Sequence, residues 1–415
     1  MTGEELAGRV IEVVRAAAAD PKAPQPLHDP LFEGNEIAYL SECIETGWVS
    51  SVGKFVERFE QDLAAFTGAA KAVAVANGTV ALHACLRLVG VEANDEVLVP
   101  TLTFVGTVNP IAYAGAIPHF VDSEAGTLGV DPDKLAEYLQ AALVTGSDGP
   151  RNRATGRRVP ALVVMHTYGH PARLDALAAV CQRFGLVLIE DAAESLGSYY
   201  RGTHTGNVGR VSAISFNGNK TVTTGGGGAI LTNDEALGAR AKHLTTTAKL
   251  PHRWSFNHDA VGYNYRMPNI NAALGCAQLE QLPGFLDAKR ALAARYMEAF
   301  RGIPGVRLFT EPPHCRSNYW LNVLLLDPEV ESLRDAVLDA TNTAGITTRP
   351  AWTLMHRLPM FDSAPRMDLA VAESLERRLI NIPSGVGTAR GKGRPGAAGS
   401  STGQPGVRGS REHGA

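Results

Sequence analysis

The chain has 415 residues, of which 45% are hydrophobic and 20% are charged, and its formal net charge is -3. This composition is ordinary for a soluble globular protein and argues against wholesale disorder. The small net charge gives no general attraction to nucleic acid or to an anionic membrane, so we expect neither as a partner. Because the length exceeds the usual size of a single core, we expect one large domain and at least one smaller one.

The cysteines give no sign of a disulfide framework or a zinc site, and we expect no metal. The five of them are spread widely along the chain: Cys43, Cys85, Cys181, Cys276 and Cys315. The first 19 residues lack the charged and then apolar order of a signal peptide, and no later segment is long enough to span a bilayer. We therefore expect a cytoplasmic protein.

Residues 1–30 are expected to form an amphipathic helix and an extended connector. Leu6, Val10 and Val14 recur at helical spacing, and residues 21–30 contain four prolines. The large domain is expected to begin after this connector, at residue 31.

Seven short apolar runs alternate with helical patterns in the large domain. They lie at residues 72–76, 96–99, 117–121, 161–165, 186–190, 211–215 and 229–231. Nearly continuous apolar strands separated by helices predict an α/β fold, in which a mostly parallel sheet is covered on both faces.

The remaining chain is expected to form a small C-terminal α/β domain and a tail. A helical pattern near residue 286 marks the end of the large domain at residue 285, and the small domain occupies residues 286–384. Residues 385–415 are rich in Gly, Ser, Pro and Ala and contain few large apolar side chains. Such a segment cannot offset the entropy cost of ordering, so we predict a flexible tail.

Lys220 is the first candidate for catalysis. It follows the predicted strand 211–215 and precedes four glycines, where a backbone can wrap closely around a ligand. A lone lysine in a loop is usually only a solvated charge, and Asn219 occupies the place where a nucleotide-binding phosphate loop needs glycine. Two neighbouring features favour a catalytic role for Lys220: the Ser215 hydroxyl and an acidic residue at the end of the preceding strand.

That acidic residue is Asp191, which follows the apolar run 186–189. The carboxyl ends of parallel strands are where open α/β sheets bind ligands. Asp191 could equally be a helix N-cap. A pyridine cofactor, however, needs a carboxylate that keeps its ring nitrogen protonated. Such a cofactor would account for both Asp191 and Lys220.

Two further segments follow predicted strands. Gly78 and Thr79 form a turn that leads into a helix, whose N-terminus is a ready anion site. Phe104 follows the strand at residues 96–99 and offers an aromatic platform at the same edge of the sheet, although it could also be core.

These residues belong to motifs that resemble the sugar aminotransferases of the DegT/DnrJ/EryC1/StrS family. The four motifs are Thr103-Phe104-Val-Gly-Thr-Val-Asn109-Pro110, Glu190-Asp191-Ala-Ala-Glu194, Ser215-Phe216-Asn-Gly-Asn-Lys220 and Gly262-Tyr-Asn264-Tyr-Arg266-Met. The resemblance covers roughly residues 31–384 and is specific, because the motifs agree in order and spacing. It implies the fold type I of pyridoxal phosphate (PLP)-dependent transferases, PLP as cofactor, and a homodimer with shared active sites.

The resemblance also implies a role for each residue. Lys220 would form the Schiff base, Asp191 would lie against the pyridine nitrogen, Phe104 would stack on the ring, and Glu194 would lie near the hydroxyl of the cofactor.

For the phosphate of the cofactor, the resemblance implies three residues of one subunit, namely Gly78, Thr79 and Ser215. It also implies that Asn264 reaches the phosphate of the partner subunit.

A finer likeness concerns the substrate. Phe32-Glu-Gly34-Asn35-Glu36 and Gly47-Trp48-Val-Ser-Ser-Val-Gly53-Lys54 look like the branch that includes LegC-type enzymes. That branch implies transfer of an amino group from glutamate to a nucleotide-linked keto sugar, at C4 of a UDP-4-keto-6-deoxy-N-acetylhexosamine. Near the expected mouth of the site, Arg349 could meet phosphates or a donor carboxylate. His356 lies in the same segment, and Arg349 could equally be a surface ion-pair partner.

Two other functions stay open at this point. The first is a nucleotide-sugar dehydratase that uses pyridoxamine phosphate, but such enzymes have histidine where this chain has Lys220. The second is a non-catalytic regulatory protein that retains a PLP pocket. The joint presence of Lys220, Asp191 and Ser215 argues against the second function.

Overall fold

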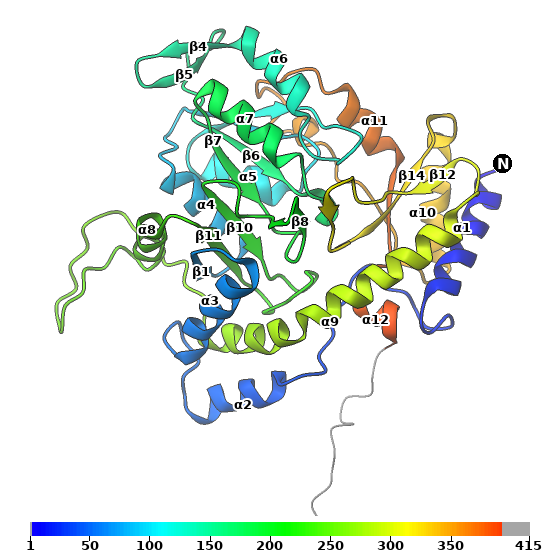
Figure 1. Cartoon of the computed structure of the whole chain (residues 1–415), viewed down its shortest axis with the longest axis horizontal. Coiled ribbons are helices and arrows are strands. Elements are labelled where there is room, and N and C mark those ends of the chain that lie inside the picture. The colour runs from blue at the N-terminus through cyan, green and yellow to red at the C-terminus, as the bar shows by residue number, and fades with distance from the viewer. Residues whose placement is uncertain (1, 392–415) are drawn as a thin grey trace, which may run out of the picture.

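The computed structural model describes residues 2–391. A seven-stranded sheet forms its centre, with the strand order β1-β11-β10-β7-β6-β2-β3 (Figure 1). The strands are β1 (Lys71–Val75), β2 (Glu96–Pro100), β3 (Ile117–Val121), β6 (Ala161–Met165), β7 (Val187–Asp191), β10 (Val211–Ser215) and β11 (Gly228–Thr232). Each of them overlaps a strand that the sequence predicted.

The sheet is mostly parallel, as predicted. β11 pairs antiparallel with β1 and β10, whereas β10, β7, β6, β2 and β3 pair with one another in parallel. Parallel strands end at the same edge of a sheet, so the residues that follow them converge there. The candidate site is therefore expected at this edge of the sheet.

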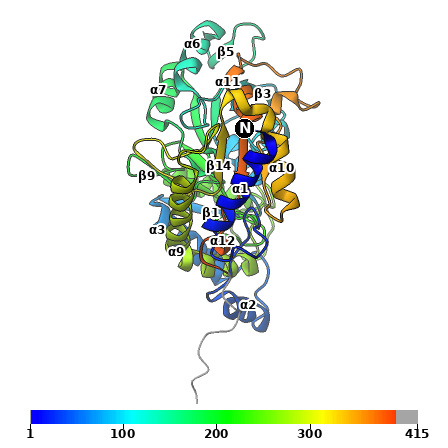
Figure 2. The same ribbon diagram turned by 90° about the vertical axis from the view of Figure 1, so that its right-hand side faces the viewer.

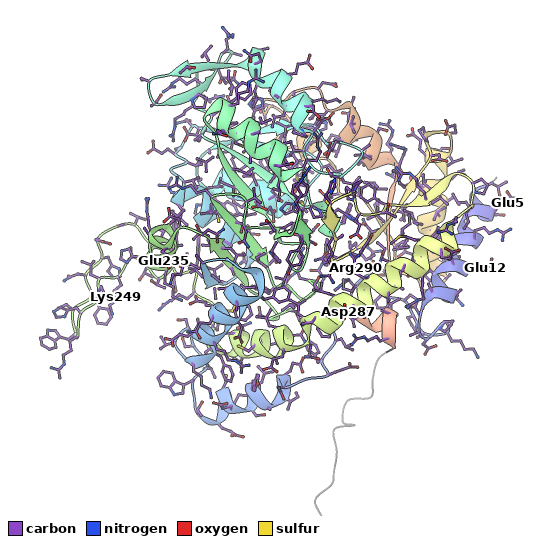
Figure 3. All side chains as sticks on the ribbon, in the orientation of Figure 1. Glu5, Glu12, Glu235, Lys249, Asp287 and Arg290 are labelled. Atoms are coloured by element: carbon purple, nitrogen blue, oxygen red, sulfur yellow. The ribbon has the colours of Figure 1, made fainter. Side chains whose placement is uncertain are left out.

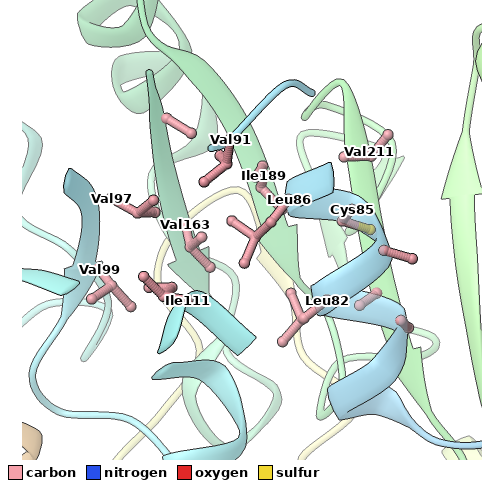
Figure 4. Close-up of a cluster of buried hydrophobic side chains, with 14 of the residues drawn as sticks. Leu82, Cys85, Leu86, Val91, Val97, Val99, Ile111, Val163, Ile189 and Val211 are labelled. Carbon is pink, nitrogen blue, oxygen red and sulfur yellow. The ribbon is translucent and has the colours of Figure 1, made fainter. Parts of the chain in front are cut away.

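Helices cover both faces of the sheet. One face carries α4 (Gly78–Leu88), α5 (Val105–Tyr113) and α8 (Glu235–Thr245), and Figure 4 shows Leu82 and Leu86 of α4 close to Val163 and Ile189 of the strands. The other face carries α3 (Lys54–Thr67) and α9 (Asn269–Phe300) together with α6 (Pro132–Ala142) and α7 (Leu174–Phe184). Burial of both faces explains why the strands are apolar at nearly every position.

A second, antiparallel sheet has the strand order β12-β14-β16-β15. It consists of β12 (Val306–Leu308), β14 (Asn322–Leu326), β16 (Leu379–Ile382) and β15 (Arg349–Pro350), and it is accompanied by α10 (Arg334–Thr343) and α11 (Ala370–Arg378). The long helix α9 joins it to the large sheet and runs without interruption through residue 285, where we expected the domain boundary.

The N-terminal helix α1 (Gly3–Ala17) packs with this smaller sheet, although it is distant in sequence. Leu6, Val10 and Val14 share a core with residues of β12, β14 and α10, and Figure 2 shows α1 beside α10 and β14. The connector then pairs with the same region through a bridge between Gln25 and Ile346. Helix α1 and the connector thus pack against the smaller sheet and its helix α10.

The predicted flexible tail needs a correction at its start. Residues Val386–Arg390 form a short helix, α12, in which Val386 is buried with Leu31 and Phe285. The Arg390 guanidinium also donates a hydrogen bond to the carbonyl oxygen of Gly284 on α9. The sequence pattern missed this helix because it has few apolar side chains of its own. The rest of the predicted tail, residues 392–415, lies outside the described residues.

The remaining elements are short. They are α2 (Glu36–Glu45), β4 (Leu143–Gly146), β5 (Gly149–Asn152), β8 (Tyr199–Tyr200), β9 (Thr203–His204), β13 (Cys315–Arg316) and short 3-10 helices at Thr167–Gly169, Pro328–Leu333 and Met355–Arg357. Residues 246–266 form an arm that projects beyond α8, with Lys249 near its outer part (Figure 3). Among the described helices, none combines the length and the apolar character that crossing a bilayer requires.

Candidate active site

One cavity of about 310 Å³ lies at the carboxyl ends of the central strands. Seven of the eight residues predicted to bind the cofactor line it: Gly78, Thr79, Phe104, Asp191, Glu194, Ser215 and Lys220. Asp191 ends β7 and Ser215 ends β10, while Gly78 and Phe104 follow β1 and β2. The strand ends therefore bring together residues that are more than a hundred positions apart.

Asp191 is buried and is held by two donors. Its Oδ2 accepts a hydrogen bond from Thr107 Oγ1 at 2.7 Å, and its Oδ1 accepts one from the backbone amide of Ala193 at 3.1 Å. Burial raises the pKa of Asp191, while the hydrogen bond from Thr107 opposes this effect. The carboxylate is thus fixed in orientation with little access to water.

Lys220 extends into the cavity between an acid and an aromatic ring. Its Nζ donates a hydrogen bond to Glu194 Oε1 at 3.3 Å and lies 3.9 Å from the centroid of the Trp320 ring. The side chain of Lys220 is 12% exposed. Its amine is therefore accessible from the cavity but largely removed from bulk water.

Glu194 is buried and has an altered acidity. Burial raises its pKa from 4.5 to about 7, although the nearby charge of Lys220 acts in the opposite direction. Its Oε2 accepts a hydrogen bond from the backbone amide of Tyr168 at 2.9 Å. Tyr168 has the left-handed backbone conformation, with φ 57°, which is uncommon for a residue other than glycine. A carboxyl group with a pKa near 7 is able to exchange protons under ordinary conditions.

The other end of the cavity is suited to an anion. Gly78 begins α4, and the side chain of Asn77 caps this helix by accepting a hydrogen bond from Val80 N at 2.9 Å. A Cβ at Gly78 would lie 2.9 Å from the Cβ of Ser215, so glycine allows the two segments to approach. The amide groups at a helix N-terminus and a serine hydroxyl such as that of Ser215 are the kinds of donor that suit a phosphate.

Aromatic side chains form the mouth of the cavity. Phe104 is 50% exposed, and its ring centroid lies 6.4 Å from that of Trp352. Trp352 in turn stacks on Tyr168, with ring centroids 4.8 Å apart. The exposed Phe104 ring is not part of the core, and it is free to cover a flat ligand.

Comparison with known proteins decides the family. The model of the DegT/DnrJ/EryC1/StrS aminotransferase family matches residues 30–392. The chain belongs to this family. It is 36% identical to the GDP-perosamine synthase of Vibrio cholerae, over 87% of this chain and 94% of that protein. It is 37% identical to EpsN of Bacillus subtilis (strain 168), named a putative pyridoxal phosphate-dependent aminotransferase, over 86% of this chain and 90% of that protein.

Solved structures agree with this assignment. The crystal structure of DesI, determined in the presence of its TDP-sugar product, superposes with a TM-score of 0.77 and 28% sequence identity, covering 90% of this chain and 92% of that one. The predicted fold class, the aminotransferase activity and the cofactor PLP are thereby confirmed.

The cavity fits the cofactor of this aminotransferase. It contains a reachable lysine amine, a buried carboxylate and, at another point of its lining, the N-terminus of α4. These groups suit the aldehyde, the pyridine nitrogen and the phosphate of PLP respectively.

Three residues that sequence reasoning missed contribute to the site of the aminotransferase. Thr107 lies in the same short motif as Phe104, so the sequence already showed that the two residues are close along the chain. Trp320 comes from the segment before β14, and Tyr168 follows β6. No local pattern marks these two residues, because only the fold brings them to Lys220 and Glu194.

The other predicted residues of the aminotransferase lie elsewhere. Asn264 is exposed on the arm and accepts a hydrogen bond from Arg266 at 3.0 Å, and it does not line the cavity. Arg349 lines a second cavity, of about 570 Å³, which shares Trp320 and Trp352 with the first.

His356 lines neither of these two cavities. It is buried between Thr101 Oγ1, at 2.8 Å from its Nδ1, and Glu373 Oε1, at 3.3 Å from its Nε2. Sequence reasoning placed His356 with the substrate; in the structure its ring packs beside Thr101, which directly follows β2.

Proposed function

We propose that this aminotransferase moves an amino group from glutamate to a nucleotide-linked keto sugar, with Lys220 as the covalent anchor of PLP and the proton carrier. The observation that carries the proposal is the position of the Lys220 amine, which faces the same cavity as Asp191 and lies 3.3 Å from Glu194. PLP, when bound, supplies a ring that accepts the electron pair left behind when a proton is removed from the donor.

Lys220 serves as base and then as acid. Its Nζ, when free, would take the proton from the α-carbon of the donor and then return that proton as an acid. Glu194 lies 3.3 Å from the amine and accepts a hydrogen bond from it, and burial raises the pKa of this acid to about 7. One lysine therefore serves both halves of the reaction.

Asp191 and the N-terminus of α4 hold the two ends of the cofactor. The negative charge of Asp191, oriented by Thr107, keeps the ring nitrogen protonated, which makes the ring a better electron acceptor. Gly78, Thr79 and Ser215 bind the phosphate through amide and hydroxyl donors. Phe104 covers the ring.

The substrate in this proposal is UDP-4-keto-6-deoxy-N-acetylhexosamine, aminated at C4. The likeness of the segments around Gly34 and Gly53 to LegC-type enzymes supports the sugar and the nucleotide. Relatives are named for a GDP sugar and a TDP sugar, so the nucleotide is the part of the proposal that needs the most direct test. The cavity beside Arg349 adjoins the reaction cavity, and we assign Arg349 to the phosphates of the nucleotide.

The active site in this proposal is completed by a second subunit. Large apolar side chains of the arm are exposed: Trp254 is 71%, Phe256 is 76% and Val261 is 87% accessible. Exposed apolar groups of this size are typical of an interaction surface. In a homodimer they are covered, and Asn264 of one arm reaches the phosphate of the cofactor bound in the partner subunit.

The test supplies the purified full-length protein with PLP, glutamate and a panel of keto sugars that carry UDP, GDP or TDP. Mass spectrometry should show that the UDP sugar is aminated at the highest rate. When the donor nitrogen carries an isotopic label, the label should appear in the aminated product. Faster amination of a GDP or TDP sugar would overturn the assigned nucleotide but not the activity. Loss of water without incorporation of nitrogen would instead support the dehydratase.

A further inference from the structure

Lys289 on α9 is a lysine that the proposed chemistry does not use. It is 0% exposed, and its Nζ donates to three acceptors: His28 Nε2 at 2.8 Å, the Trp320 carbonyl at 3.2 Å and the Ser384 carbonyl at 2.6 Å. None of these acceptors is a carboxylate, and burial lowers the pKa values of both Lys289 and His28. Burying an amine in this way costs free energy, so we expect its hydrogen bonds to have a function.

The three acceptors come from distant parts of the chain. His28 belongs to the N-terminal connector, Trp320 precedes β14, and Ser384 follows β16. Lys289 therefore joins three segments of the small domain to α9, and the neighbouring Arg290 marks this part of the helix in Figure 3.

Trp320 is held at both ends. Its carbonyl oxygen accepts the hydrogen bond from Lys289, and its indole Nε1 donates to the carbonyl oxygen of Asn219 at 2.8 Å. Between these two anchors, the ring lies against the Lys220 amine, 3.9 Å from Nζ to the ring centroid. A continuous path of contacts thus runs from Lys289 through Trp320 to Lys220.

We propose that Lys289 is a positioning residue, whose hydrogen bond to the Trp320 carbonyl holds the indole ring against the nitrogen of Lys220. This inference rests on the proposed role of Lys220. An indole face stabilises a positive charge placed over it, so a fixed ring favours the protonated form of the Lys220 nitrogen when it is joined to the cofactor. If the ring withdraws, that form loses stability.

The experiment measures the pH midpoint of the absorption band of PLP joined to Lys220, in the full-length protein loaded with PLP. Trp320→Leu should lower this midpoint by about 0.5 to 1 pH unit, as expected for the loss of one cation–π contact. Lys289→Met should lower it in the same direction. In the double variant, Lys289→Met should cause no further shift, because its effect passes through Trp320.

Arg290→Met is the matched control. Arg290 is the next residue on α9, and it pairs with Glu311 at 2.8 Å and donates to the Ser317 carbonyl at 2.7 Å, whereas the Trp320 carbonyl accepts from Lys289. This variant should lower the melting temperature without moving the midpoint. Should Lys289→Met fail to fold, His28→Leu removes one acceptor of Lys289, and it should shift the midpoint less but in the same direction.

The outcomes separate the two proposals. A wild-type protein that forms no such band sinks the role of Lys220 and, with it, this inference. If the wild-type protein forms the band and Lys289→Met changes only the melting temperature, the inference is overturned and the role of Lys220 stands. Shifts that add in the double variant also overturn it, because Lys289 then acts independently of Trp320.

Discussion

Glu194 and Lys220 form a nearly buried acid and amine pair, in which Lys220 Nζ lies 3.3 Å from Glu194 Oε1 and the two side chains are 2% and 12% exposed. The pair unites two motifs that are 26 residues apart. It gives the site a group that titrates near neutral pH, next to the amine that carries the proposed reaction.

The raised pKa of Glu194 predicts a particular pH dependence of stability. Burial shifts the pKa from 4.5 to about 7, so folding favours the protonated acid. The corresponding stability is complete below about pH 4.5 and is lost as the pH rises through 7, a change of about 3 kcal/mol. Glu194→Gln should therefore weaken the fall in melting temperature of the cofactor-free protein between pH 5 and pH 8. Glu57→Gln, on the exposed face of α3, should leave the fall unchanged, and an unchanged fall in Glu194→Gln would contradict the assignment.

Lys220→Ala should abolish the absorption band of lysine-bound PLP and reduce turnover roughly 1000-fold or more, because Lys220 supplies the only lysine amine among the described residues that line this cavity. Absorbance spectra and product formation from glutamate and a keto sugar measure the two effects. Lys242→Ala is the control, because Lys242 pairs with Glu60 outside the cavity and should keep both properties. Full transamination by Lys220→Ala would refute the assignment.

Asp191→Asn should keep the shape of the side chain but remove its charge, and turnover should fall at least about 100-fold because the ring nitrogen loses its counter-ion. The lysine-bound band should still form. Thr107→Val removes one hydrogen bond to the carboxylate and should cost only about 10-fold. Steady-state kinetics distinguish these values, and equal turnover in Asp191→Asn and the wild type would exclude the proposed contact.

Ser215→Ala should weaken the binding of PLP about 10-fold through the loss of one hydrogen bond to phosphate. Gly78→Ala should also weaken it, because the new Cβ meets the Ser215 Cβ at 2.9 Å and displaces the start of α4. Gly126→Ala, which adds a Cβ in open space, should leave the affinity unchanged. Titration of the cofactor-free protein with PLP measures all three, and an unaltered affinity in both site variants would place the phosphate elsewhere.

A mixture of two impaired variants tests the shared site. Asn264→Ala alone should reduce PLP affinity and turnover at least 10-fold if one subunit supplies this amide to the partner. When Asn264→Ala and Lys220→Ala chains are mixed and allowed to exchange, random pairing should restore about a quarter of the wild-type activity, since half of the dimers then contain one intact site. Activity equal to the mean of the two parent variants would show that each site is built from a single chain.

The sequence by itself determined the central sheet and the reactive centre. Continuous apolar runs such as residues 161–165 identify strands that are buried on both faces, whatever their neighbours are. Asp191 and Ser215 stand at the ends of two such runs, and parallel strands end at one edge, so their meeting with Lys220 followed from local patterns alone. The family and the cofactor were likewise predicted from residues within short motifs, and both predictions were confirmed.

Only the tertiary structure decided which distant side chains surround these residues. Trp320 reaches Lys220 across a hundred positions, α1 joins a core made by β12, β14 and α10, and α12 docks on α9 although its composition predicted no order. Each of these contacts depends on how two segments that are distant in sequence pack together. Their side-chain patterns are compatible with many neighbours, and the choice among them is made by the shape and burial of the whole chain.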